Sequence, residues 1–339
     1  MKKTRIAALI GLLIFSSSTL AQASWIWSPD LGKWINPKKA AKDTPEEQYD
    51  WALQFFNQKD WDRAIEEFEK LEETFPTSRL AAEAVYYQGL GWEQKNDPSK
   101  AANAYQKLVD RYPYSDRIKD AVKNEFEIAN EFASGGKVKM LGVPVLPGQD
   151  KAVELYNHII KNAPFGSYGD QAQYKLAELY QSQGEYELAQ KAFQAVVDEY
   201  PSSELVPQAK YQIANASMQA SNKGQYDEQH AEQAIEQFKE FKSTFPAATQ
   251  TTQADESIRK IRTEKAQRSF DVAAFYEKQQ KWSSAKVYYE ELIREYPETP
   301  SAVTAKKKLD DLVRRQSEPA PSKFPQLPKL PKLPKLKLW

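Results

Sequence analysis

WDRAIEEFEKLEETFP, residues 61–76, has apolar residues spaced along one helix face and ends at a proline. The stretch WSSAKVYYEELIREYP, residues 282–297, has the same pattern much later in the chain. When the chain is aligned on the alanine of the first stretch, the pattern occurs six times. Self-similarity of this kind predicts stacked structural repeats.

Four positions define the repeat: an alanine, an aromatic residue four later, a large apolar residue seven later, and a proline twelve later. The alanines are Ala64, Ala101, Ala152, Ala189, Ala234 and Ala285, and the prolines are Pro76, Pro113, Pro164, Pro201, Pro246 and Pro297. The apolar positions lie on one face of a helix. Proline ends that helix because it lacks an N–H and disfavours helical geometry in the preceding residue.

A second helix precedes each of these, for example over residues 171–184 and 269–280. The spacing of the alanines is 37 residues in two places, while gaps of 51, 45 and 51 residues predict insertions. This pattern is typical of tetratricopeptide repeats. The sequence therefore predicts an all-α, right-handed superhelical solenoid of about six tetratricopeptide-like helix-turn-helix repeats with a concave groove. A plain helical bundle is the alternative.

Residues 1–23 have the features of a secretory signal peptide: three basic residues, a short apolar stretch and Ala21-Gln22-Ala23 as the cleavage pattern. A membrane anchor is the alternative, but the apolar stretch is shorter than the roughly 20 residues that a bilayer requires. Lys and Arg number 47, as do Asp and Glu, and removing residues 1–23 leaves 44 − 47 = −3. This balance gives no indication of nucleic-acid binding.

Three further segments depart from the repeat. Residues 24–45 form a Trp-rich N-terminal segment, which we expect to cap the first repeat as a strap, with docking to another envelope protein as the alternative. The apolar insertion 134–150 either packs over the solenoid, which we favour, or contacts a partner. The polar insertion 220–230 is expected on the surface.

Residues 316–339 form a tail rich in Pro, Lys and Leu. Its three-residue period matches polyproline II, which would align Lys329, Lys332 and Lys335 along one edge. We expect the tail to be a solvated, disordered segment, and contact of this basic, apolar tail with anionic lipid headgroups or with a peptide groove is the alternative. If it is disordered, its deletion leaves the fold intact, so a large loss of thermal stability would contradict that interpretation.

Several stretches carry a resemblance to a known family. They are Pro164-Phe165-Gly166-Ser167-Tyr168, Asp227-Glu228-Gln229-His230-Ala231 and Val272-Ala273-Ala274-Phe275-Tyr276-Glu277-Lys278. Over roughly residues 150–313 the chain resembles the BamD (YfiO/ComL) family, the tetratricopeptide component of the outer-membrane β-barrel assembly machinery. On this basis residues 121–315 hold BamD-like repeats 3–6, and residues 46–120 hold two extra repeats. Family members usually carry a lipidated cysteine where the signal peptide ends. This chain has no cysteine and has Ala23-Ser24 at that position.

The resemblance implies an exported, periplasmic scaffold at the inner face of the outer membrane. Its protein partners would be unfolded barrel precursors, recognised by residues 150–215, and a barrel-forming assembly protein, clasped by residues 255–313. Membrane-surface contact through the basic tail is a further expectation. The candidate contact residues are Tyr174, Tyr180 and Tyr211 on first helices of the repeats, with Phe165 and Tyr168 at the turn that matches the family.

The sequence offers little for catalysis. The chain has two histidines, His158 and His230, and no thiol. Neither histidine has a second ligand three or four residues later, and no common catalytic motif is present. We therefore expect no enzyme activity, catalytic residue, metal or cofactor. The alternative functions are a periplasmic scaffold that coordinates cell-wall (peptidoglycan) or other envelope enzymes, and a secreted enzyme that carries helical repeats.

Overall fold

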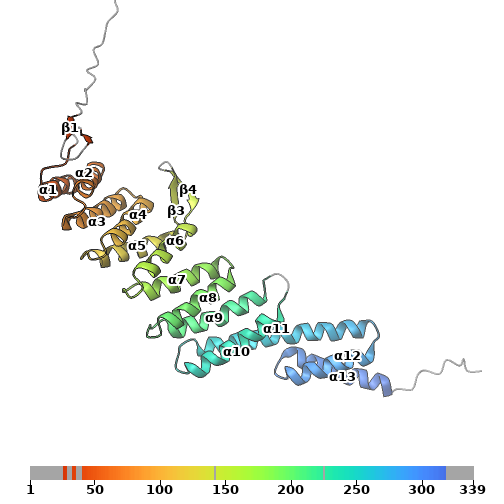
Figure 1. The fold of residues 1–339 in the computed structure, drawn as a ribbon. Helices are drawn as coiled ribbons and strands as arrows, with labels where there is room; N and C mark the ends of the chain where they lie inside the picture. The colour runs from red at the N-terminus through yellow and green to blue at the C-terminus, as the bar shows by residue number, and fades with distance from the viewer. Residues whose placement is uncertain (1–25, 29–32, 36–39, 141–142, 224–225, 318–339) are drawn as a thin grey trace, which may run out of the picture. The chain divides into compact units, whose positions relative to one another are not determined.

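The computed structural model describes residues 26–28, 33–35, 40–140, 143–223 and 226–317, which form thirteen helices and two small sheets (Figure 1). The chain divides into an N-terminal unit within residues 1–168 and a C-terminal unit within residues 169–339. The predicted signal peptide and nearly all of the predicted tail lie outside the described residues.

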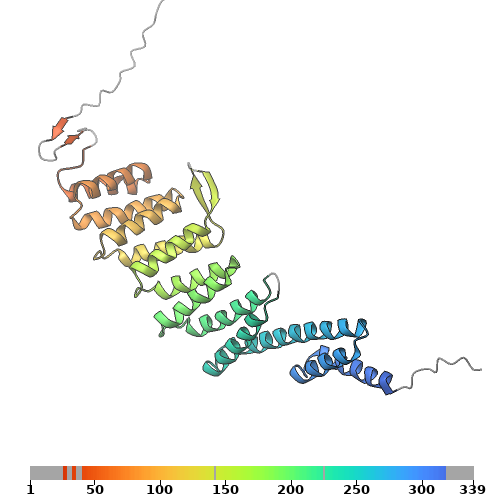
Figure 2. The same ribbon diagram turned by 45° about the vertical axis from the view of Figure 1, so that its right-hand side comes forward.

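Consecutive helices within each unit pack against each other (Figure 2). The N-terminal unit contains α1 (Pro45–Asn57), α2 (Trp61–Thr74), α3 (Arg79–Gln94), α4 (Pro98–Arg111), α5 (Ile118–Ala133) and α6 (Gln149–Asn162). The C-terminal unit contains α7 (Gly169–Ser182), α8 (Tyr186–Glu199), α9 (Val206–Ser221), α10 (Glu228–Thr244), α11 (Thr251–Lys278), α12 (Trp282–Glu295) and α13 (Pro300–Ser317). The predicted all-α helical-repeat fold is confirmed.

The repeat positions form the core of both units. All six repeat alanines are fully buried, at 0% exposure. The aromatic residues four positions later are also at 0% exposure: Phe68, Tyr105, Tyr156, Phe193, Phe238 and Tyr289. Small alanine side chains let neighbouring helices approach, and the aromatic rings then fill the space between them. The periodic pattern in the sequence therefore marks the buried face of every second helix.

The repeat prolines mark where these helices end. In α2 the last backbone hydrogen bond runs from the N–H of Phe75 to the carbonyl of Leu71, at 2.8 Å, and Pro76 follows. The same bond closes the equivalent helix in the other five repeats. Proline has no N–H with which to extend the ladder, so each of these helices ends at the predicted place.

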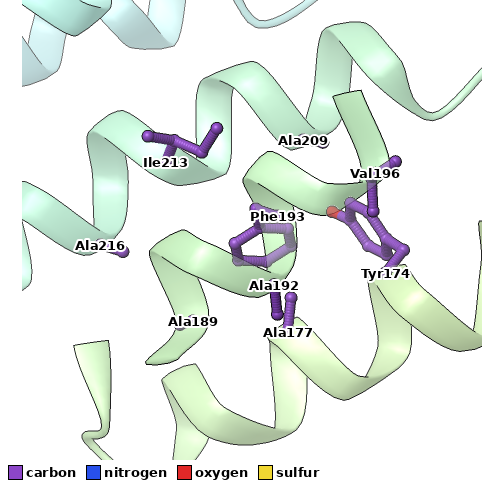
Figure 3. Close-up of a cluster of buried hydrophobic side chains, with 9 residues drawn as sticks. All are labelled: Tyr174, Ala177, Ala189, Ala192, Phe193, Val196, Ala209, Ile213 and Ala216. Atoms are coloured by element: carbon purple, nitrogen blue, oxygen red, sulfur yellow. The ribbon is translucent and has the colours of Figure 1, made fainter. Parts of the chain in front are cut away.

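One cluster in the C-terminal unit shows how the helix pairs interlock (Figure 3). The rings of Tyr174 from α7 and Phe193 from α8 lie 5.2 Å apart in an edge-on arrangement. Ala177, Ala189 and Ala209 surround them and are all fully buried. The cluster therefore joins three successive helices by close packing of aromatic rings against small side chains.

Close packing also explains a glycine inside α3. A Cβ atom at Gly89 would lie 2.4 Å from Cε1 of Tyr105, whose ring is fully buried. Replacing glycine by alanine in a helix ordinarily gains about 1 kcal/mol. Here we expect Gly89→Ala to lower the free energy of unfolding by about 1–3 kcal/mol, because the ring has no room to move. Urea unfolding of the wild-type protein and the variant measures the change in the free energy of unfolding. Equal or greater stability of the variant would contradict this packing.

The long gap before the last repeat is filled by helix. The sequence predicted an insertion between Ala234 and Ala285 and a separate helix over 269–280. Instead, α11 is a single helix of 28 residues. Its first half packs on α10 through Ala254 and Ile261, and its second half packs on α12 through Ala266 and Ala273. The insertion therefore lengthens α11, which packs on α10 with its first half and on α12 with its second half (Figure 2).

The apolar insertion between α5 and α6 forms a hairpin of β3 (Lys137–Met140) and β4 (Val143–Pro147). Its base is closed by a 2.9 Å hydrogen bond from the N–H of Gly148 to the carbonyl of Gly136. Val143 is 59% exposed and Leu146 is 49% exposed. The favoured packing over the solenoid is therefore wrong for these two side chains, because the strands satisfy their hydrogen bonds with each other.

A second hairpin lies in the Trp-rich segment, where β1 (Ile26–Ser28) pairs with β2 (Lys33–Ile35). The pairing places Trp27 opposite Trp34. The sequence did not predict these strands. That the segment caps the first repeat stays a prediction.

Candidate partner-binding surface

The five predicted contact residues do not form one surface. Phe165 is 97% exposed, but the ring of Tyr168 lies 5.1 Å from Phe126. Tyr174 is only 4% exposed. Tyr180 packs against the same cluster as Tyr174.

Tyr211 is also directed into a helix pair, with its ring 5.5 Å from Phe238 and 5.7 Å from Phe241. Tyr174 and Tyr211 each pack beside the buried aromatic residue of the neighbouring helix. The side chains of Tyr174, Tyr180 and Tyr211 therefore pack mainly between helices. Of the five, Phe165 is the one side chain that is exposed to solvent over nearly all of its surface.

Phe165 has a close counterpart in the N-terminal unit. It directly follows repeat proline Pro164, and Tyr114 directly follows Pro113. Tyr114 is 99% exposed. The four other repeats have Thr77, Ser202, Ala247 and Glu298 at this position. Two successive turns of one unit therefore expose an aromatic side chain that contributes nothing to the core.

The C-terminal unit contains a hollow of about 370 Å³ where α10, α11 and α12 meet, which we call the α11 pocket. Its lining residues are Tyr226, Glu228, Lys265, Arg268, Ser269, Val272, Tyr288, Glu291, Leu292, Glu295 and Tyr296. It lies at the place where α11 passes from α10 to α12. Aromatic rings with a few charged groups are the usual composition of a binding hollow.

The cations of the α11 pocket are fixed by neighbouring groups. Lys265 is buried and pairs with Glu232 and with Glu228, the latter at 3.2 Å. Burial by itself lowers the pKa of Lys265, but its hydrogen bonds with these carboxylates outweigh burial and raise that pKa. The guanidinium of Arg268 lies 3.7 Å from the ring centre of Tyr226. Lys265 therefore remains charged at neutral pH, and Arg268 presents its charge beside an aromatic face.

An apolar strip continues from the pocket along α11. Val272 is 41% exposed and Phe275, one turn further on, is 57% exposed. Beside them the rings of Tyr276 and Tyr288 stack at 5.1 Å with an angle of 7°. Exposed apolar and aromatic side chains flanked by charged groups are typical of the centre of a protein interface.

The sequence pattern did not predict the residues of the α11 pocket. The 51-residue gap between Ala234 and Ala285 was the available signal, because it marked where the repeat departs from its regular spacing. Val272 and Phe275 also occur in a stretch that carries the family resemblance. The tertiary contact that places α10 beside the middle of α11 could not be inferred from either signal.

Among residues 40–140, 143–223 and 226–317, no group of three or more His, Asp or Glu side chains is placed to hold a metal ion. Within the same ranges no helix is both long enough and apolar enough to cross a membrane.

His158 of α6 lies between two carboxylates in the N-terminal unit. Its Nδ1 is 2.9 Å from Oε1 of Glu125, and its Nε2 is 3.2 Å from Oδ1 of Asp110. Burial disfavours the charged imidazole, but the two carboxylates outweigh burial and raise the pKa of His158 above its ordinary 6.5. These side chains join α4, α5 and α6, and we assign them to the packing of the unit.

This pKa shift predicts a pH-dependent stability. Because the folded-state pKa of His158 exceeds the unfolded value, its stabilisation is fully present below the unfolded pKa and is lost as pH rises through the folded pKa. We expect His158→Gln to lower the free energy of unfolding by about 1.5–3 kcal/mol at about pH 6, as for hydrogen bonds to charged groups. The difference should shrink towards about pH 9.

Urea unfolding across this pH range measures the effect. Glu127→Gln is the matched control, because Glu127 lies on the same helix as Glu125 with its side chain 62% exposed. The control should follow the wild-type pH profile. A His158→Gln difference that does not change with pH would contradict the assignment.

The paired helices and their repeat positions define a tetratricopeptide-repeat protein, and residues 49–116 match a tetratricopeptide-repeat family. Residues 149–317 match the YfiO family, described as outer membrane lipoprotein. Through this region the chain belongs to the YfiO (BamD-type) family. Proteins of this family are typically non-catalytic scaffolds. The predicted family resemblance is confirmed.

Several solved structures share similarity with the chain. The C-terminal part of a tetratricopeptide-repeat protein from Cytophaga hutchinsonii is 14% identical, with 78% of this chain and 88% of that chain covered and a TM-score of 0.35. The MamA protein is 17% identical, with 60% and 92% covered and a TM-score of 0.33. PilW, a type IV pilus biogenesis factor, is 13% identical, with 78% and 100% covered and a TM-score of 0.29.

Proposed function

We propose that the protein is a non-enzymatic periplasmic scaffold that helps to assemble β-barrel proteins at the inner face of the outer membrane. The match of residues 149–317 to the YfiO family is the main support for this proposal. Tetratricopeptide repeats bind other proteins on their exposed helix faces, which suits such a role.

The α11 pocket and the strip beside it form the surface for the barrel-forming partner. Phe275 and Val272 supply apolar area for the centre of an interface, and Arg268 and Glu291 supply charges at its edge. Large exposed apolar side chains contribute most to binding when a ring of polar groups excludes water around them. The pocket lies within residues 255–313 apart from Tyr226 and Glu228, so it agrees with the region that the family resemblance assigns to clasping.

Unfolded barrel precursors would be bound elsewhere, by residues 150–215. Phe165 is the candidate contact there that is almost fully exposed. An exposed aromatic side chain can stack on the apolar and aromatic residues of an extended chain. Tyr114 on the preceding repeat extends this precursor-binding role along the same unit.

Photo-crosslinking in intact cells tests the partner. A crosslinking amino acid at Phe275 should capture a barrel-forming membrane protein as the dominant product. The same amino acid at Val303, which is 57% exposed on α13 and outside the pocket lining, is the control and should capture far less. Capture of cell-wall enzymes or peptidoglycan fragments from Phe275, without a barrel protein, would instead support the cell-wall scaffold.

A further inference from the structure

The α11 pocket has the composition of a groove that binds proline-rich segments. Three of its lining residues are tyrosines, namely Tyr226, Tyr288 and Tyr296, and Val272 and Leu292 add apolar area between them. Polyproline II segments dock in grooves lined by aromatic rings, because proline rings pack on flat aromatic faces. We propose that the proline-rich segment of this same chain, residues 318–339, docks in the α11 pocket.

The sequence of this segment fits the pocket in period and in charge. Prolines recur every third residue at Pro325, Pro328, Pro331 and Pro334, and lysines recur with the same period at Lys329, Lys332 and Lys335. In polyproline II each set would form one edge of the segment, with about 9 Å between successive members. One edge then packs on the tyrosines while another presents ammonium groups.

The pocket carries carboxylates for those ammonium groups. Glu291 and Glu295 lie one turn apart on α12, and their nearest cation is Arg294, at 3.8 Å and 3.0 Å respectively. Glu228 is the third carboxylate and pairs with Lys265. Because Lys265 is held by Glu228 and Glu232, and Arg268 lies over Tyr226, the α12 carboxylates are the groups that an added lysine would meet.

The segment begins close enough to reach the pocket. It follows Ser317, the last residue of α13, and α13 packs against α12 within the same compact unit. The segment has 22 residues, so as polyproline II it spans roughly 68 Å. The whole of α12, with 14 residues, is about 21 Å long. The segment therefore has about three times the length needed to run back along α12.

Attachment to the same chain allows weak contacts to hold the segment in place. A short tether gives an effective concentration on the order of 1 mM, so an intrinsic Kd of about 100 μM keeps about nine-tenths of the molecules docked. If the proposed function is right, docking covers the partner surface and lowers the apparent affinity for the partner about tenfold. This consequence rests on the proposed function, but the docking itself does not.

Photo-crosslinking of the purified full-length chain tests the docking without any partner. A photo-crosslinking amino acid at Val272, in the pocket, should form a product with residues 325–337. The matched control places it at Val303, which is also exposed but does not line the pocket. Mass spectrometry of a mixture of ¹⁵N-labelled and unlabelled chains separates crosslinks within one chain from those between copies.

We expect a product within one chain from Val272, at least fivefold more abundant than from Val303. The combined substitutions Lys329→Glu, Lys332→Glu and Lys335→Glu should reduce it by a similar factor, because they reverse the charge that faces Glu291 and Glu295. Equal yields at both positions, no product, products only between copies, or insensitivity to charge reversal would each overturn the proposal. None of these outcomes bears on capture of a partner from Phe275 in cells.

Discussion

Tyr105→Ala is expected to lower the free energy of unfolding of the N-terminal unit by about 3–5 kcal/mol, the range for removing a large buried aromatic side chain. Tyr105 is the aromatic repeat residue of α4 and is fully buried. Its hydroxyl donates to Glu93 at 2.6 Å and accepts from the amide of Asn124 at 3.0 Å. The substitution therefore creates a cavity and also removes a hydrogen bond from a half-buried carboxylate.

Tyr114→Ala is the matched control, since the same side chain is lost from the same unit at a position that is 99% exposed. We expect the control to change stability by less than about 0.5 kcal/mol. Urea unfolding followed by far-UV circular dichroism measures both variants. A loss of less than about 1 kcal/mol for Tyr105→Ala would mean that the repeat aromatics do not hold the helix pairs together.

Phe275→Glu is expected to reduce capture of the partner at least tenfold. Phe275 is 57% exposed, so its ring contributes little to folding and is available to an interface. Burying a new carboxylate at the centre of an apolar contact costs at least the about 1.4 kcal/mol that corresponds to a tenfold change in affinity. Quantitative recovery of the partner with tagged protein from crosslinked cells measures the loss.

The control for this variant is Val303→Glu, an equally exposed apolar position on α13. It should leave recovery of the partner within about twofold of wild type, and both variants should keep the wild-type melting temperature, because surface substitutions rarely matter for stability. Equal losses from the two variants would argue against a specific contact at the α11 pocket.

The parts of the fold that follow the repeat could be predicted from sequence. The buried alanines, the buried aromatics and the helix ends at Pro76 and its five equivalents all depend on local spacing and on the chemistry of proline. The hairpin at residues 137–147 was not predicted, although residues 137–140 alternate between polar and apolar side chains, because its strands have only four and five residues and the second contains Pro144 and Pro147. The pairing also shifts register between Val138 and Lys139, which a sequence pattern cannot reveal.

The candidate site was harder to predict for a different reason. An aromatic residue on a first helix has the same sequence signal whether it faces a groove or a neighbouring helix. Tyr174 illustrates this, since its ring packs on Phe193 and is almost completely buried. The exposed residues that define the α11 pocket come together only because α11 continues as one helix past α10. Before the helix over 269–280, the sequence predicted only an insertion of unknown structure in this gap, so the pocket could be found only from the tertiary structure.

Depletion of the protein from its own cells, followed by quantification of folded β-barrel proteins in the outer membrane, tests the assembly role most directly. An assembly scaffold predicts that folded barrel proteins fall several-fold before growth slows, while peptidoglycan crosslinking stays at its normal level. Unchanged barrel proteins together with altered peptidoglycan would contradict the assembly role and would favour a scaffold for cell-wall enzymes.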